Sequence, residues 1–110
     1  SLYLTENETD NEYELFDVIL ESIIDPSKLK FNTLRENIYN ILIYNISVND
    51  FIWYILKGIE SKKTELNITN NKLGLIIDDI YSSLQLYNNN YRPIYHLEKI
   101  VLTLIKHIHE

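Results

Sequence analysis

Hydrophobic residues recur along most of this chain at every third or fourth position, which is the spacing of an amphipathic α-helix. The first stretch with this period follows a polar segment of about eight residues. It ends at Asp25-Pro26, because the residue before a proline is driven out of the α-helical region. We expect a flexible segment over residues 1–10 and one folded domain over residues 11–110. The apolar stripe of this first helix consists of Phe16, Ile19, Leu20, Ile23 and Ile24.

The same period predicts a second and a third helix. The second should run from Ser27, a residue type that suits a helix N-cap, to Asn45. The third should start near Val48 and fade in the polar residues 60–65. The expected buried stripes are Leu34, Ile38, Ile41 and Leu42 in the second helix, and Phe51, Ile52, Ile55, Leu56 and Ile59 in the third.

Two more helices complete the pattern. A fourth should run from near Thr69 to about Tyr87, and the asparagines at 88–90 should form a turn because asparagine tolerates left-handed backbone geometry. Pro93 suits the first turn of a fifth helix, where its missing N–H costs nothing. The expected apolar positions of this helix are Ile94, Leu97, Val101, Leu104 and Ile108, and those of the fourth are Leu73, Ile76, Ile77, Ile80, Leu84 and Tyr87.

No alternating stretch of strand length stands out, and the 110 residues contain only two glycines. Five helices joined by short connections form the simplest architecture for such a pattern. The sequence therefore predicts an all-α fold: a single domain of about five helices packed as a bundle. The first residue is Ser1 and the chain has no methionine, so we expect it to be part of a longer protein.

Charge and composition exclude several kinds of function. The formal net charge is −6 and only two arginines occur, whereas a protein that binds nucleic acid usually carries a basic stripe. We therefore expect no direct nucleic-acid binding. Cysteine is absent, which excludes disulfides, thiolate zinc sites and cysteine nucleophiles. No apolar run reaches 18 residues, so no membrane span is expected.

The sequence also lacks recognisable catalytic motifs. A phosphate-binding loop needs clustered glycines and a Lys-Ser/Thr pair, whereas Gly58 and Gly74 are isolated within predicted helices. No Gly-x-Ser-x-Gly nucleophile elbow occurs. We therefore expect no catalytic site and no cofactor in this segment.

Metal binding is not expected either. His107 and His109 are two residues apart and would point in different directions on a helix, and His96 lies about 16 Å from His107 along the axis. We expect these three histidines in solvent or at an interface. The carboxylates of the first helix, at Glu12, Glu14, Asp17 and Glu21, are expected to stay hydrated.

Four large side chains fall outside the predicted buried stripes. Trp53 and Tyr54 lie off the arc of the third helix, and Tyr95 and Leu102 lie together on a second side of the fifth. Aromatic residues off a core face mark partner surfaces, where Trp and Tyr are enriched. We assign these four residues to a candidate subunit interface. The alternative is that other helices of the same chain cover them.

Three segments resemble the small subunits of replication factor C, the loader of the sliding clamp. The likeness is nearest to the subunits numbered three in animals and five in yeast. Ile94-Tyr95-His96-Leu97-Glu98 resembles the last-helix motif of that family, and Leu84-Gln85-Leu86 the end of the preceding helix. The segment from Leu34 to Leu42 resembles its second collar helix. The likeness covers residues 11–109, although the link from Tyr87 to Pro93 is longer than in the family and has no glycine.

This resemblance implies a C-terminal collar domain, which packs with those of four other subunits into a ring. ATP and Mg²⁺ would belong to an AAA+ domain elsewhere in the parent protein, and the sliding clamp and primer-template DNA would be partners only through the whole complex. The implied location is the nucleus. Two alternatives stay open: an unrelated helical adaptor that binds a peptide or helix in a groove, and a small helical enzyme or ligand carrier.

Overall fold

The computed structural model describes residues 2–87 and 93–110, and this part of the chain is helical without any strand. The predicted all-α fold is thereby confirmed. The predicted turn at 88–90 lies outside the described residues. The elements are α1 (Leu2–Ile24), a short 3₁₀ helix η1 (Pro26–Lys28), α2 (Phe31–Ile43), α3 (Val48–Ser61), α4 (Asn70–Tyr87) and α5 (Pro93–His109).

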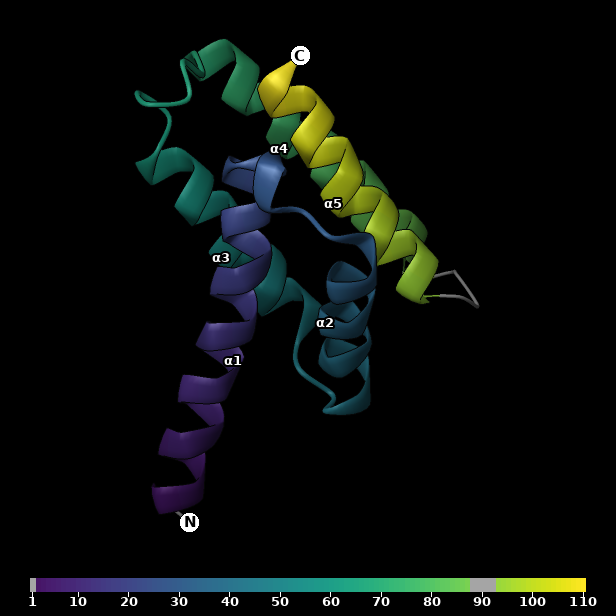
Figure 1. Cartoon of the computed structure of the whole chain (residues 1–110). Coiled ribbons are helices and arrows are strands. Elements are labelled where there is room, and N and C mark those ends of the chain that lie inside the picture. The colour runs from purple at the N-terminus through teal and green to yellow at the C-terminus, as the bar shows by residue number, and fades with distance from the viewer. Residues whose placement is uncertain (1, 88–92) are drawn as a thin grey trace.

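Helix α5 organises the fold. It lies beside α4 along its length and also contacts α1 and α2, while α1 packs against α3 (Figure 1). The N-terminal end of α1 extends away from the other helices (Figure 1). Helices α3 and α4 are therefore held mainly by different neighbours, α3 by α1 and α4 by α5.

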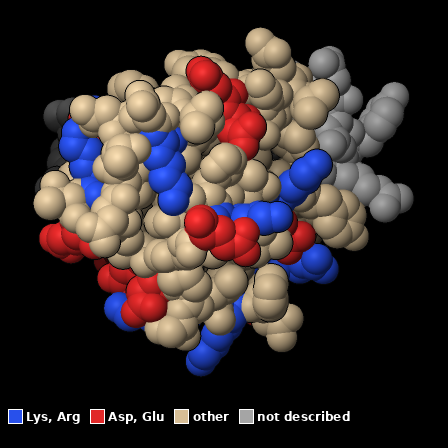
Figure 2. All heavy atoms as spheres, turned by 90° about the horizontal axis from the view of Figure 1, so that it is seen from above, with Lys and Arg blue, Asp and Glu red and all other residues tan. Residues whose placement is uncertain are grey.

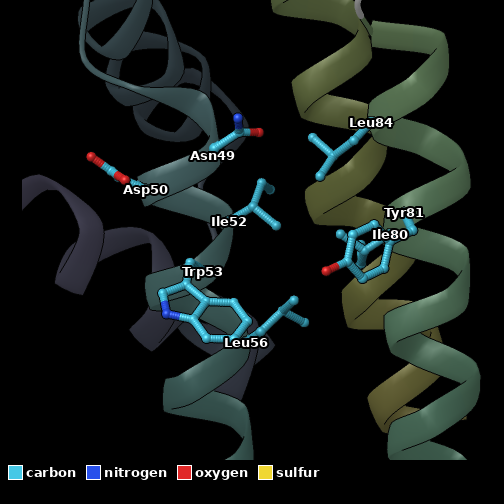
Figure 3. A pocket seen from close by; sticks show the side chains of 8 residues that line it. All are labelled: Asn49, Asp50, Ile52, Trp53, Leu56, Ile80, Tyr81 and Leu84. Atoms are coloured by element: carbon cyan, nitrogen blue, oxygen red, sulfur yellow. The ribbon is translucent and has the colours of Figure 1, made fainter.

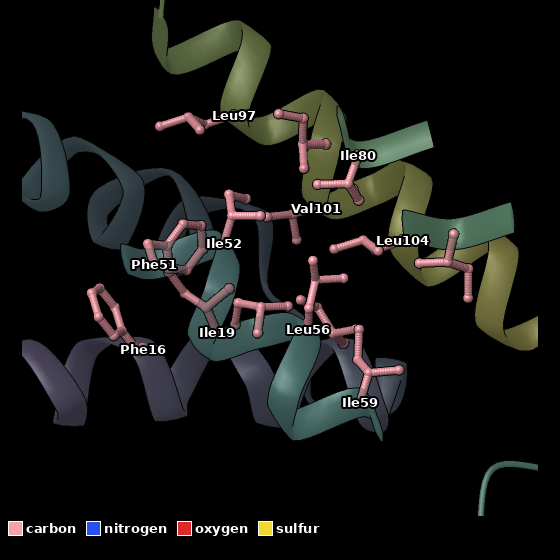
Figure 4. Close-up of a cluster of buried hydrophobic side chains, with 14 of the residues drawn as sticks. Phe16, Ile19, Phe51, Ile52, Leu56, Ile59, Ile80, Leu97, Val101 and Leu104 are labelled. Atoms are coloured by element: carbon pink, nitrogen blue, oxygen red, sulfur yellow. The ribbon is translucent and has the colours of Figure 1, made fainter. Parts of the chain in front are cut away.

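The apolar stripes predicted from the sequence form one continuous core (Figure 4). All five predicted positions of α3 are buried, as are Leu97, Val101, Leu104 and Ile108 of α5. In α1, Phe16, Ile19 and Ile23 are buried, whereas Leu20 and Ile24 are only partly covered. Burial of a large aliphatic or aromatic side chain stabilises the fold by about 1.5–3 kcal/mol, so these stripes dominate its stability.

The start of α2 differs from the prediction. Ser27 does not cap this helix but lies inside η1, where its backbone N–H (3.1 Å) and hydroxyl (2.7 Å) both donate to Oδ1 of Asp25. These two bonds hold the pKa of Asp25 below its ordinary value. Pro26 favours the first position of this short turn, and Leu29 and Lys30 are extended, so α2 begins only at Phe31. The Ser27 N-cap was therefore a wrong prediction.

The boundaries that follow the start of α2 agree closely with the sequence pattern. Ser47 Oγ accepts the backbone N–H of Asp50 and caps α3, and Thr69 Oγ1 caps α4 in the same way. Helix α2 ends in a Schellman motif, in which Asn45 takes a positive φ of 55° and Ile46 N–H donates to the carbonyl of Ile41. Asparagine suits this position because it tolerates left-handed geometry.

The N-terminal boundary of α1 is earlier than expected. The polar residues 1 to about 8 were placed before the helix, but α1 already begins at Leu2. Polar residues of moderate helix propensity can continue a helix whose later turns are fixed by tertiary packing. The flexibility of residues 1–10 stays a prediction.

Candidate interaction surface

Several polar side chains of α5 form hydrogen bonds with the neighbouring helices of the same chain. His96 is buried, and its Nε2 donates to the carbonyl of Ser83 on α4; a carbonyl can only accept, so Nε2 carries the proton. His109 Nε2 likewise donates to the carbonyl of Ile23 at the end of α1, over 2.8 Å. His107 pairs with Asp79 on α4.

The expectation of solvated or interface histidines is wrong for His96, which is buried, whereas His107 is half-buried and His109 is exposed, although each has a partner within the chain. His96 was placed on the solvent side of α5, but α4 lies on that side and supplies the acceptor. A helical wheel shows which residues share a face, and it does not show how many faces neighbouring helices cover. Within residues 2–87 and 93–110, no three His, Cys, Asp or Glu side chains gather closely enough to hold a metal ion.

Arg35 and Glu98 form a bidentate ion pair between α2 and α5. Arg35 Nε donates to Oε2 of Glu98 over 2.8 Å, and Nη2 donates to Oε1 over 3.1 Å. The hydrogen bond and charge of Glu98 raise the pKa of Arg35. The guanidinium also lies 5.6 Å above the centre of the Tyr95 ring, within range of a cation–π interaction. One face of Tyr95 is therefore directed at Arg35, while the side chain remains 50% exposed.

Tyr54 is held by α1. Its hydroxyl donates to Oδ1 of Asp17 over 2.5 Å, and its ring lies 5.4 Å from that of Tyr13 and 5.5 Å from that of Phe16. The hydrogen bond to Asp17, with burial and the negative charge of Asp17, raises the pKa of Tyr54 to about 12. Helix α1 thus covers much of the Tyr54 side chain. This agrees with the alternative interpretation, in which other helices of the same chain cover the candidate residues.

Trp53, in contrast, remains 58% exposed. It lines a groove between α3 and α4 with a volume of about 360 Å³. Trp53 projects from α3 and Tyr81, 60% exposed, from α4, while the more buried Leu56 and Leu84 point into the space between the helices (Figure 3). The full lining consists of Asn49, Asp50, Ile52, Trp53, Leu56, Ile80, Tyr81 and Leu84.

Tyr81 is the part of this groove that the sequence analysis missed. It follows Ile80 and lies outside the buried stripe of α4, just as Trp53 lies outside that of α3. The same signal that singled out Trp53 was therefore present for Tyr81. What the sequence could not show is that α3 and α4 diverge enough to leave a groove between these two side chains.

The two remaining candidates lie on α5 as the helical wheel places them, away from the core. Leu102 is 37% exposed and Tyr95 is half-exposed, whereas Val101 and Leu104 are buried. Other large apolar side chains that the sequence analysis did not single out are also exposed. They are Tyr13 and Val18 on α1, Phe31, Tyr39, Ile43 and Tyr44 on and after α2, and Leu75 and Leu86 on α4.

Comparison with protein-family models, with curated proteins and with solved structures finds no match to this chain.

Figure 2 shows lysine and arginine side chains interspersed with aspartate and glutamate over the face drawn. Across the described helices, none combines the length and apolar character that crossing a membrane requires. The surface also carries apolar and aromatic features, among them the α3–α4 groove and the exposed side chains of Tyr95 and Leu102.

Proposed function

We propose that this chain is an oligomerisation domain, the collar domain of a replication factor C small subunit. The observation that carries the proposal is the ion pair between Arg35 and Glu98. Arg35 belongs to the segment that resembles the second collar helix, and Glu98 ends the segment that resembles the last-helix motif. Two segments that lie far apart in the sequence, and that both carry the resemblance, therefore contact each other through residues of both motifs.

Each residue of the Tyr95–Glu98 segment has a distinct structural role, which gives a physical reason for the motif. Leu97 is buried in the core, His96 binds the Ser83 carbonyl next to the Leu84-Gln85-Leu86 segment, and Glu98 binds Arg35. Tyr95 is the member that remains half-exposed. The three segments of the resemblance are thus joined around the N-terminal half of α5.

In this role the domain acts by presenting surfaces to other subunits. Exposed aromatic side chains such as Trp53 and Tyr95 contribute large contact areas at little cost in conformational entropy. Leu102 adds an aliphatic side chain on the same side of α5, two turns beyond Tyr95. The proposed role assigns no catalytic step to this segment: ATP and Mg²⁺ would be bound by an AAA+ domain of the parent protein, and the sliding clamp and DNA by the whole nuclear complex.

Co-expression with the replication factor C subunits of the same organism tests the proposal. We expect the chain to co-elute with at least one of them in size-exclusion chromatography, and the parent gene to encode a phosphate-binding loop upstream. A chain that is folded by circular dichroism and yet co-elutes with none of the subunits would overturn the proposal.

A further inference from the structure

The exposed residues of α5 form one stripe along the helix. They recur in alternating steps of four and three residues, which keeps them on one side of an α-helix. This α5 stripe consists of Tyr95, Lys99, Leu102, Lys106 and His109. Its lysines alternate with the two residues of the candidate interface. The outer side of α5 is therefore both apolar and basic, with Leu102 between two lysines.

Helix α1 carries an exposed stripe of the opposite charge. The helix contains acidic residues along its length and no lysine or arginine. Between residues 12 and 24, two of the exposed side chains contact Tyr54. The other three lie within about 60° of one another around the helix axis. This α1 stripe consists of Glu14, Val18 and Glu21, so an aliphatic side chain lies between two carboxylates.

The charged side chains at the centre of both stripes are available to a partner. Neither glutamate of the α1 stripe and neither lysine of the α5 stripe forms an ion pair within residues 2–87 and 93–110. Lys28 and Lys30 line a small pocket together with Val18, but neither of them pairs with these glutamates. Opposite charges on two exposed helix faces favour the pairing of those faces. The α1 stripe and the α5 stripe are thus complementary in charge.

The spacing of the two stripes matches when the helices run in opposite directions. In the α1 stripe the glutamates lie four residues before and three residues after the aliphatic residue, and in the α5 stripe the lysines lie three before and four after. With Val18 opposite Leu102 in an antiparallel pair, each glutamate therefore lies opposite a lysine. The ion pairs would be Glu14 with Lys106 and Glu21 with Lys99. In a parallel pair each glutamate would be one residue out of register, which turns a side chain by about 100° around the helix.

We infer that this chain self-associates, and that the α5 stripe of one copy binds the α1 stripe of a second copy in antiparallel orientation. The inference goes beyond the proposed function, because it requires this chain alone. Two exposed ion pairs and one aliphatic contact form a small interface, so the dissociation constant should be of the order of 10⁻⁴ M. Because the α5 stripe includes Tyr95 and Leu102, a second copy and a partner subunit would compete for α5.

Sedimentation equilibrium of the chain alone tests the inference separately from the proposed function, since no other subunit takes part. We expect self-association that weakens by about fivefold or more between about 0.05 M and about 0.5 M salt, because exposed ion pairs are screened. A chain that is still monomeric at about 1 mM would overturn the inference. Self-association that does not respond to salt would overturn it as well.

Charge reversal tests the pairing itself. Glu14→Lys with Glu21→Lys makes both stripes basic, and Lys99→Glu with Lys106→Glu makes both acidic. Each double variant alone should self-associate about tenfold more weakly than the unchanged chain. An equimolar mixture of the two should recover the association, because each stripe then meets one of opposite charge. A mixture as weak as its two components would contradict the inference.

The matched control for charge reversal is Glu36→Lys with Glu60→Lys. It changes two exposed glutamates outside both stripes and gives the same net charge as the basic double variant. We expect this control to self-associate at least as strongly as the unchanged chain. A loss equal to that of the basic double variant would show that net charge, and not the α1 stripe, determines the association.

A disulfide trap locates the contact while leaving both sets of charges in place. The chain has no cysteine, so Val18→Cys and Leu102→Cys each introduce a single thiol. Oxidation of a mixture of the two should link them to each other in preference to linking identical copies, because the contact places these side chains opposite one another. Tyr44→Cys, exposed and outside both stripes, replaces Val18→Cys in the control mixture. Equal yields of linked species in the two mixtures would overturn the inference.

Discussion

Arg35 and Glu98, which lie 63 positions apart in the sequence, join α2 to α5 through two parallel hydrogen bonds. The side chain of Glu98 is mostly buried, whereas that of Arg35 is more than half exposed. Glu98 is thus held within the packing around α5, and Arg35 approaches it from the solvent-exposed side. It orients the guanidinium over Tyr95, and so it couples the packing of two helices to the position of an exposed aromatic ring.

The first prediction concerns this ion pair. Arg35→Gln and Glu98→Gln should each lower the stability of the domain, and the double variant should lose less than the sum, because each single variant removes the same interaction. Urea denaturation of the four proteins of this double-mutant cycle measures the coupling. Arg35→Lys is the matched variant: it keeps the charge, loses the fork geometry and should recover only part of the coupling. Strictly additive losses would show that the two side chains do not stabilise one another.

The second prediction concerns the ionisation of Tyr54. Its pKa is raised from the ordinary 10.0 to about 12, first by its hydrogen bond to Asp17. A raised pKa means that the fold favours the protonated phenol, so this contribution to stability is complete below pH 10 and is lost as the pH rises towards 12. In an alkaline absorbance titration, one tyrosine should ionise later than expected for an ordinary side chain.

Two variants assign that late titration. Tyr54→Phe should remove it, and Asp17→Asn should move it back towards pH 10, since the carboxylate is its main cause. Tyr39→Phe, which changes an exposed tyrosine, is the control and should leave the late component in place. A late component that persists in Tyr54→Phe would assign the raised pKa to a different tyrosine.

The third prediction compares the two glycines, which both lie within helices. Alanine in place of glycine stabilises an exposed helix position by about 0.5–1 kcal/mol. A methyl group at Gly74 meets no other atom within 4 Å, so Gly74→Ala should show this gain. At Gly58 the same methyl would lie 2.4 Å from Cδ2 of Leu20 and 2.9 Å from its Cδ1, so Leu20 must move.

We therefore expect Gly58→Ala to be less stable than Gly74→Ala in thermal unfolding followed by circular dichroism. The double change Gly58→Ala with Leu20→Ala separates the steric term from helix propensity, because the clashing methyl groups are then absent. Equal gains at both positions would show that Leu20 moves aside without cost, and that α1 and α3 are less tightly packed there than the structure indicates.

Helix boundaries could be predicted from the sequence where local interactions determine them, and could not where tertiary packing does. The helices α3 and α5 were predicted well, because their apolar residues have a regular period and Pro93 is a strong local signal for the start of α5. The start of α2 was not, because Ser27 can cap a helix or bind Asp25 in a short turn, and only the packing of the chain selects between them. A local signal is sufficient to place the start of a helix when it fits only one local structure. It is insufficient when a helix cap and a short turn can both use the same residue.

The candidate interface residues on α3 show the same difference between local and tertiary effects. The sequence separated Trp53 from the core of α3, and the structure leaves this side chain exposed. It grouped Tyr54 with Trp53, yet α1 provides Asp17 and Phe16 for Tyr54. Whether a residue off the core stripe is covered depends on a neighbouring helix, and periodicity within one helix carries no information about it. The groove between α3 and α4 could not be predicted for the same reason.

The last prediction separates the core of α5 from its candidate interface by two matched substitutions. Leu104 is buried in the core, whereas Leu102 is 37% exposed on the side of the helix that carries Tyr95. Leu104→Asp should unfold the isolated domain, because burial of an unpaired carboxylate costs several kcal/mol against a total stability of roughly 5–15 kcal/mol. Leu102→Asp should leave it folded, with a loss of about 1 kcal/mol from helix propensity and partial burial. The same variant should weaken co-elution with partner subunits, since a carboxylate would be placed in an apolar contact. Circular dichroism melts decide the first half and size-exclusion chromatography the second. If Leu102→Asp melts as early as Leu104→Asp, this side of α5 belongs to the core of the domain; if Leu102→Asp folds and assembles normally, the neighbour binds elsewhere.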